Sequence, residues 1–128
     1  MLDLHLHSTF SDGTCTPEEL VRQARELGVY GIALTDHDTT QGIHRFMEAG
    51  RACGVITVSG VEISADYSNG TMHILGYGLN PDDEALNERL QWIREGRRER
   101  NRIIHAKLEG LGMPIPWSSM LIFTKFPG

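Results

Sequence analysis

The chain alternates short apolar stretches with segments of helical periodicity, and this order constrains the fold more than any other sequence feature. Leu2–His7 alternates apolar and polar residues, as a half-buried strand does. Gly31–Thr35 is a short apolar run typical of a buried parallel strand. Val55–Ile63 and Thr71–Leu79 have the pattern of two further strands, joined as a hairpin by a turn at Ser68–Gly70.

Helices are expected between these strands and after the last one. Thr16 is the predicted N-cap of the first helix, Glu19 completes a capping box, and Gly28 ends the helix. A second helix is expected over about 40–52 and a long polar one over about 82–111. The order β-α-β-α-β-β-α predicts an α/β fold with helices packed on a mainly parallel sheet.

Composition excludes several classes of protein. The chain has 128 residues, enough for one domain, with 40% hydrophobic residues and a formal charge of −5. An acidic chain is not a general nucleic-acid coating protein, although bound divalent cations would still allow an anionic substrate. Two cysteines, Cys15 and Cys53, predict reduced thiols. No stretch approaches the length of a transmembrane helix, so we expect a cytoplasmic protein with no membrane partner.

Candidate metal ligands lie at the predicted carboxyl ends of the strands, where parallel sheets gather their chemistry. Side chains two positions apart share a strand face, which brings two histidines of the first strand together. The antiparallel return strand carries a further histidine back to the same edge. The candidates are His5, His7, Asp12, His37, Glu62 and His73.

Each of these residues has an ordinary structural explanation when taken alone. Their gathering at one sheet edge is better explained by a metal site. A nitrogen and oxygen donor set without thiolates favours a catalytic multimetal centre over a structural zinc site. A carboxylate such as Glu62 can bridge two metals, and paired metals suit displacement at phosphorus.

Four segments resemble, in order, motifs of the polymerase and histidinol phosphatase (PHP) domain family. They are Asp3–Gly13, Ala33–Thr39, Gly60–Ser64 and Met72–Tyr77. The resemblance covers about residues 1–112 and is closest to small bacterial phosphoesterases. That branch includes enzymes acting on nucleoside 3',5'-bisphosphates and on the 5' ends of short RNAs.

The resemblance implies a distorted (β/α)₇ barrel with up to three divalent ions, for which Zn, Mn and Fe are all suitable. It also implies that metal-activated water hydrolyses a phosphate ester of a small molecule or a short nucleic acid. By this resemblance the first metal would be bound by His5 and His7, the second by His73, and the third by Asp12 and His37, with Glu62 bridging the first two.

The family pattern includes a further histidine and a late Asp-x-His element, which have no counterpart after His105. We therefore expect the N-terminal part of the barrel, incomplete in this chain and truncated or split. Residues 1–80 would carry the metal motifs, 81–112 would begin the family's helical insert, and 113–128 would be a non-matching tail. Such a chain is expected to hold fewer than three metals and to self-associate through its exposed sheet edge.

Several polar residues near these motifs have alternative interpretations. The arginines between Arg94 and Arg102 suit a solvated helix face with glutamate partners, and Arg100 and Asn101 are the exceptions predicted to bind substrate phosphate. Asp36 and Asp38 are expected either to support metal ligands or to cap a helix.

Two other functions are compatible with the same residues. Amidohydrolases also place His-x-His at the end of the first barrel strand, but they usually bridge their metals with a carbamylated lysine where this chain has Glu62. A PHP segment without catalytic activity, serving as an accessory module, is the second alternative.

Overall fold

The computed structural model describes residues 1–67 and 70–119 and confirms the predicted order of elements. The elements are β1 (Leu2–Leu6), α1 (Pro17–Glu26), β2 (Gly31–Leu34), α2 (Ile43–Cys53), β3 (Ile56–Tyr67), β4 (Gly70–Tyr77) and α3 (Glu84–Gly110). Most of the predicted turn at Ser68–Gly70 and most of the tail, residues 120–128, lie outside the described residues.

The sheet has the strand order β1-β2-β3-β4, with β1, β2 and β3 parallel and β4 antiparallel to β3. The long strand β3 changes partner along its length: Ile56–Ser59 pairs with β2, and Gly60–Tyr67 pairs with β4. A Cβ atom at Gly60 would lie 2.9 Å from the carbonyl oxygen of Leu34 and 3.0 Å from that of Gly76. Glycine therefore permits the close approach at which the sheet curls, and the result is the α/β half-barrel that the sequence predicts.

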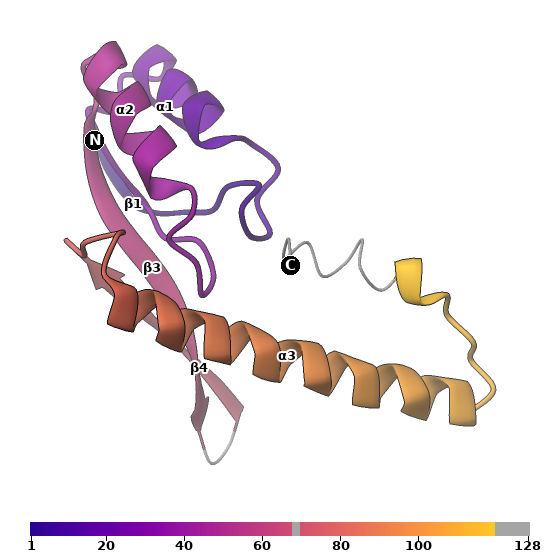
Figure 1. Cartoon of the computed structure of the whole chain (residues 1–128). Coiled ribbons are helices and arrows are strands. Elements are labelled where there is room, and N and C mark those ends of the chain that lie inside the picture. The colour runs from indigo at the N-terminus through magenta and orange to yellow at the C-terminus, as the bar shows by residue number, and fades with distance from the viewer. Residues whose placement is uncertain (68–69, 120–128) are drawn as a thin grey trace.

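Helices α1 and α2 lie together on one face of the sheet, as Figure 1 shows, and enclose the apolar core. Val21 of α1 and Phe46 of α2 are fully buried against Ile32 and Leu34 of β2. The capping box predicted for α1 is present, since the Glu19 amide donates to Thr16 Oγ1 at 3.3 Å and the Thr16 amide to Glu19 Oε2 at 2.8 Å. Local capping and core packing thus act on the same helix.

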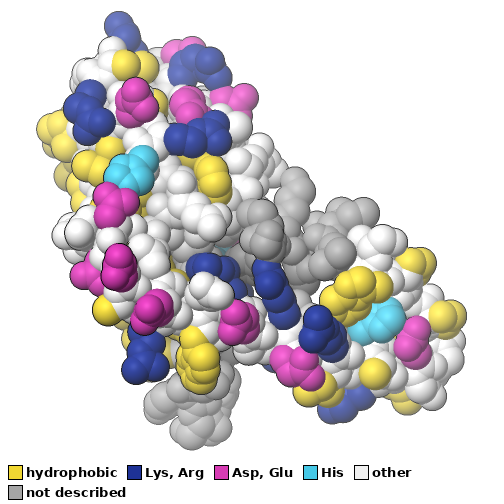
Figure 2. Space-filling view, viewed as in Figure 1, with side chains coloured by type: hydrophobic (Ala, Val, Ile, Leu, Met, Phe, Trp, Pro, Cys, Tyr) yellow, Lys and Arg dark blue, Asp and Glu magenta, His cyan; other side chains and the backbone are white. Residues whose placement is uncertain are grey.

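Helix α3 differs from this core layer. It spans 27 residues, but only Leu90 among them is buried, and Trp92 is 70% exposed. Figure 1 shows its second half extending beyond the sheet, and in Figure 2 basic, acidic and apolar side chains are interspersed along it. At its far end the Trp117 ring packs edge-on against His105, at 5.3 Å between ring centroids.

Part of the sheet surface remains uncovered. Strand β1 forms one edge of the sheet, where Leu2 is 54% and Leu4 is 42% exposed. Tyr77 of β4 reaches across to this edge, and its hydroxyl donates to the Leu4 carbonyl at 2.8 Å. Among the helices described, none combines the length and apolarity needed to cross a membrane.

Candidate metal centre

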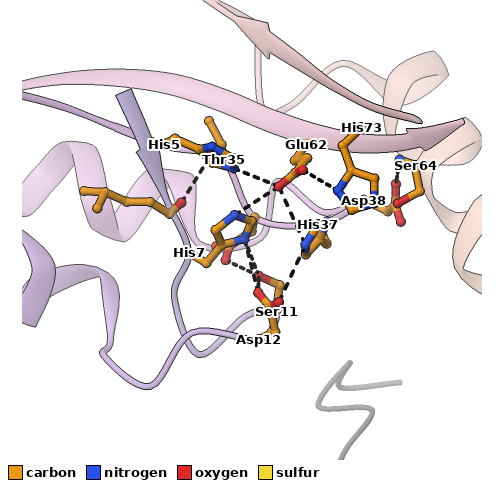
Figure 3. A network of polar contacts seen from close by, with 12 residues as sticks. His5, His7, Ser11, Asp12, Thr35, His37, Asp38, Glu62, Ser64 and His73 are labelled. Carbon is orange, nitrogen blue, oxygen red and sulfur yellow. Dashed lines mark hydrogen bonds and ion pairs between the residues drawn. The ribbon is translucent and has the colours of Figure 1, made fainter. Parts of the chain in front are cut away.

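Glu62 lies at the centre of the candidate site. Its side chain is only 4% exposed, and imidazole nitrogens of four histidines surround its carboxylate, as Figure 3 shows. Nε2 atoms approach Glu62 Oε2, at 3.0 Å from His5 and His7 and 3.6 Å from His37. His73 Nδ1 lies 2.5 Å from Oε1. A single buried carboxylate therefore meets residues from β1, β4 and the loop after β2.

The main chain places His37 beside Glu62. The two residues form an isolated parallel β-bridge beyond the end of β2. The amide of Asp38 donates to the Glu62 carbonyl at 2.9 Å, and the amide of Glu62 donates to the Asp36 carbonyl at 3.2 Å. These bonds extend the β2–β3 pairing to the two functional residues, so their side chains emerge on the same side.

Asp12 reaches the site because the loop after β1 folds back on itself. At Gly13 a Cβ atom would lie 2.1 Å from the His7 carbonyl oxygen, a contact that only glycine avoids. Asp12 Oδ1 then lies 3.2 Å from His7 Nδ1, and Asp12 Oδ2 lies 3.6 Å from His37 Nε2. The carboxylate stands between the ends of two strands.

The buried carboxylate of Asp36 holds this loop in place. It accepts hydrogen bonds from the Ser8 amide at 2.7 Å, the Ser8 hydroxyl at 2.6 Å and the Ser11 hydroxyl at 2.5 Å. The interpretation of Asp36 and Asp38 as helix caps is wrong, because the N-cap of α2 is Gly42, without a side-chain cap bond. Both aspartates instead support the loops that carry the candidate ligands.

Burial and charge set the protonation of the site. Burial lowers the pKa of His37, against the opposing carboxylates of Glu62 and Asp12. Burial alone would raise the pKa of Glu62, but hydrogen bonds from His5 and His73 reverse the effect, so this pKa is lowered overall. An ionised carboxylate beside a neutral imidazole is the state in which both can ligate a metal.

Three groups of donor atoms, each within 4.8 Å of one another, lie around this carboxylate: His5, His7 and Glu62; His7, Asp12 and His37; and His37, Glu62 and His73. Two ligands at about 2.0–2.1 Å from one ion stand about 3 Å apart at octahedral angles and about 3.4 Å apart at tetrahedral angles. The contacts of His5 and His7 with Glu62, at 3.0 Å, and of His7 with Asp12, at 3.2 Å, match that range. His37 turns Nε2 toward Asp12 and Glu62, while its other ring nitrogen, Nδ1, is buried without a hydrogen-bond partner among the described residues. The donors therefore fit divalent ions.

All six sequence-predicted ligands are thus brought together, although they come from four separate segments. Histidines outside the set stay outside the site. His44 is an exposed residue of α2 that contacts Asp82 at 2.7 Å, and His105 Nε2 contacts the Ile115 carbonyl at 2.6 Å.

Two arginines that the sequence interpretation assigned to a solvated face contact the site loop instead. Arg94 Nη1 donates to the Asp38 carbonyl at 2.5 Å, and Arg97 Nη2 lies 2.9 Å from Asp38 Oδ2. The expected solvated pairing is present at Arg102, 3.3 Å from Glu99. The 94–97 spacing places both arginines on the face of Leu90, which is the signal that could have identified them.

The two predicted substrate-binding residues lie on different faces of α3. Asn101 is half-buried and lies one turn beyond Arg97, on its face of α3, whereas Arg100 is exposed. Neither is among the residues that surround Glu62.

A model of the PHP domain matches residues 3–108. The chain belongs to the PHP family. It is 42% identical over 112 residues to the 3',5'-nucleoside bisphosphate phosphatase of Chromobacterium violaceum. The aligned residues make up 88% of this chain and 39% of the relative. It is 39% identical over 121 residues to the 5'-3' exoribonuclease Rnm of Salmonella typhimurium, which covers 93% of this chain and 41% of the relative.

Solved structures agree with this assignment. An amidohydrolase from Chromobacterium violaceum, with bound sulfate and no metal, superposes with a TM-score of 0.87 at 36% identity, covering 99% of this chain and 46% of that one. A protein assigned as a metal-dependent phosphoesterase from Bifidobacterium adolescentis superposes with a TM-score of 0.84 at 35% identity. The superposition covers 98% of this chain and 43% of that one. The chain thus spans about two fifths of the length of the curated PHP relatives it matches.

Proposed function

We propose that this PHP chain forms the metal-binding part of a phosphoesterase that hydrolyses phosphate esters of nucleotides. Nucleoside 3',5'-bisphosphates and the 5' ends of short RNAs are the proposed substrates. The observation that carries the proposal is the buried Glu62 carboxylate, enclosed by four imidazoles at 2.5–3.6 Å. The phosphatase and exoribonuclease names of the two curated relatives support the substrate class.

In this proposal each candidate ligand has a place. His5 and His7 would hold a first ion, His73 a second, and Asp12 and His37 a third, and Glu62 would contribute its carboxylate to the first two. Bound Zn, Mn or Fe would supply Lewis acidity, lowering the pKa of water and neutralising phosphoryl oxygens. The protein contributes the Glu62 carboxylate, whose lowered pKa keeps it ionised and whose charge would offset part of the repulsion between nearby cations.

The proposed substrate contact is the α3 face that passes over the His37 loop. Asn101 lies on this face and can donate a hydrogen bond from its amide to a phosphate oxygen. Arg100, on the adjacent face, can form an ion pair with the same phosphate. Arg94 and Arg97 are already engaged with Asp38, so we assign substrate contact to the residues beyond them.

An amidohydrolase is the second candidate, because one of the similar solved structures bears that name. The sequence disfavours it on one point: the first 106 residues contain no lysine, so no carbamylated lysine can bridge metals within the strands. In this proposal Glu62 would take the bridging place.

Phosphate release from adenosine 3',5'-bisphosphate by residues 1–128 with added Mn²⁺ tests the proposal, against a cyclic amide as the competing substrate. We expect release that depends on Mn²⁺ and is lost in His7→Ala. His44→Ala is the matched control, since this exposed histidine also faces a carboxylate but lies on the outer surface of α2. Turnover of the amide alone would support the amidohydrolase, and no release above His7→Ala would support a non-catalytic module.

We also propose a cytoplasmic location, based on two free cysteines, and self-association through the β1 edge. The exposed Leu2 and Leu4 support the second proposal. Sedimentation analysis should show oligomers that Leu4→Lys shifts toward the monomer. A wild-type chain that sediments as a monomer at all concentrations would contradict it.

A further inference from the structure

Asp38 is a fully buried aspartate next to a candidate metal ligand, and each of its polar groups is engaged. Its amide donates to the Glu62 carbonyl at 2.9 Å. Its Oδ1 accepts from the Ser64 amide at 3.2 Å, and its carbonyl accepts from Arg94. Arg97 Nη2 lies 2.9 Å from Oδ2 as an ion pair, without the alignment of a hydrogen bond.

The backbone of Asp38 is strained as well. Its φ is +52°, the only positive value among the described non-glycine residues. Aspartate tolerates this left-handed conformation better than most residues, but the surrounding contacts must hold it there. Asp38 directly follows His37, and its amide donates one of the two backbone bonds that hold His37 beside Glu62.

The groups that hold the turn come from two other elements. Ser64 lies on β3, two residues after Glu62, and Arg97 of α3 contacts the Ser64 hydroxyl as well as Asp38. The Arg97 side chain is 20% exposed and the Asp38 side chain is 0% exposed. Water therefore has little access to either partner of the pair. Without Arg97, the Ser64 amide is the one hydrogen-bond donor that the described residues leave on this buried carboxylate.

We propose that the Asp38–Arg97 pair positions the metal centre by locking the His37 loop onto β3, and that it thereby couples α3 to metal binding. The inference rests on the proposed metal centre. Arg97 pairs with Asp38, whose amide closes the bridge to Glu62. A helix with one buried residue, Leu90, is thus held to the domain in part by a buried charge.

Amide hydrogen exchange and Co²⁺ binding test this in the 1–128 chain. In the metal-free protein, Arg97→Met should speed exchange of the Asp38 amide at least 10-fold, because that amide donates to Glu62. The same variant should raise the Kd for Co²⁺, followed by visible absorption, about 10- to 100-fold, the range found for residues that support metal ligands. Arg97→Lys keeps the charge and should lie between the variant and the wild type.

Arg102→Met is the matched control, because it removes the same charge from the same helix but breaks only an exposed contact with Glu99. Its Asp38 exchange and Co²⁺ affinity should stay within twofold of wild type. Unchanged Asp38 exchange in Arg97→Met would overturn the lock, and faster exchange with unchanged Co²⁺ affinity would overturn its positioning role. If Arg97→Met fails to fold by circular dichroism, Arg97→Lys decides by the same two criteria.

The two arms separate this inference from the proposed function. A wild-type chain that binds no Co²⁺ contradicts the metal centre, whereas exchange of the Asp38 amide in the metal-free chain still reports on the lock. Asp38→Asn in combination with Arg97→Met should add no more than twofold to either single change, because both remove one interaction.

Discussion

The α1–α2 layer and helix α3 are attached to the same sheet by different forces. The first encloses a dry cluster around Phe46 and Val21, both 0% exposed. The second buries Leu90 alone and is held near its middle by Arg94 and Arg97 against a buried aspartate. Apolar burial scales with area and tolerates small shifts, whereas a buried ion pair depends on position.

The candidate metal centre lies where these two regions meet. His37 follows the end of β2 and pairs with Glu62 in the middle of β3, and both strands also pack against or border the core. Asp38 ties the loop that carries His37 to α3. A rigid layer can therefore supply the ligand positions, and the less buried helix can respond to what binds there. The predictions below test this division.

The largest effect is expected in the core layer. Phe46→Ala leaves a cavity among close-packed side chains and should lower the free energy of unfolding by about 3–5 kcal/mol. Urea denaturation followed by circular dichroism measures it. A loss below about 1 kcal/mol would mean that the α1–α2 layer is not the stable part of the chain.

At the boundary between the regions, Glu62→Gln removes the central charge and keeps the size of the side chain. Affinity for Co²⁺ should fall about 100-fold, or about 3 kcal/mol, since the carboxylate belongs to two of the three donor groups. Isothermal titration measures the change. Glu48→Gln on α2 is a control for loss of one carboxylate, and equal effects of the two would exclude a specific metal site at Glu62.

Helix caps give a smaller contrast. Thr16→Ala removes the capping box of α1 and should cost about 1 kcal/mol of global stability, because α1 unfolds with the core. Asp83→Ala removes the cap of α3, where Asp83 Oδ1 accepts from the Leu86 amide at 2.8 Å, and should increase only local fraying. Thermal unfolding and hydrogen exchange distinguish the two, and equal losses of global stability would place both helices in one cooperative unit.

The smallest effect is expected at Trp92. This large side chain is 70% exposed on α3, so Trp92→Ala should change the free energy of unfolding by less than about 0.5 kcal/mol. The comparison with Phe46→Ala uses the same denaturation experiment. A loss similar to that of Phe46 would show that Trp92 is covered in solution, for example by self-association.

Much of the fold was accessible from local signals. Apolar alternation and cap residues located β1, α1 and β2 to within a residue or two, because each depends on neighbours in the sequence. The prediction started α2 early, at about residue 40, whereas the helix begins at Ile43. The intervening Thr40 instead bonds Asn87 of α3 at 2.6 Å, a contact between residues 47 positions apart.

The sequence by itself determined the element order, the family and the six candidate ligands, because motif spacing and strand periodicity are written along the chain. Only the tertiary structure decided how these ligands meet, since Glu62 acquires its four imidazoles from segments up to 57 positions away. It also decided that Asp38 and Arg97 meet, across 59 positions. Buried charges pair with the groups that lie nearest in space. Which groups lie nearest is set by the curl of the sheet and the path of α3.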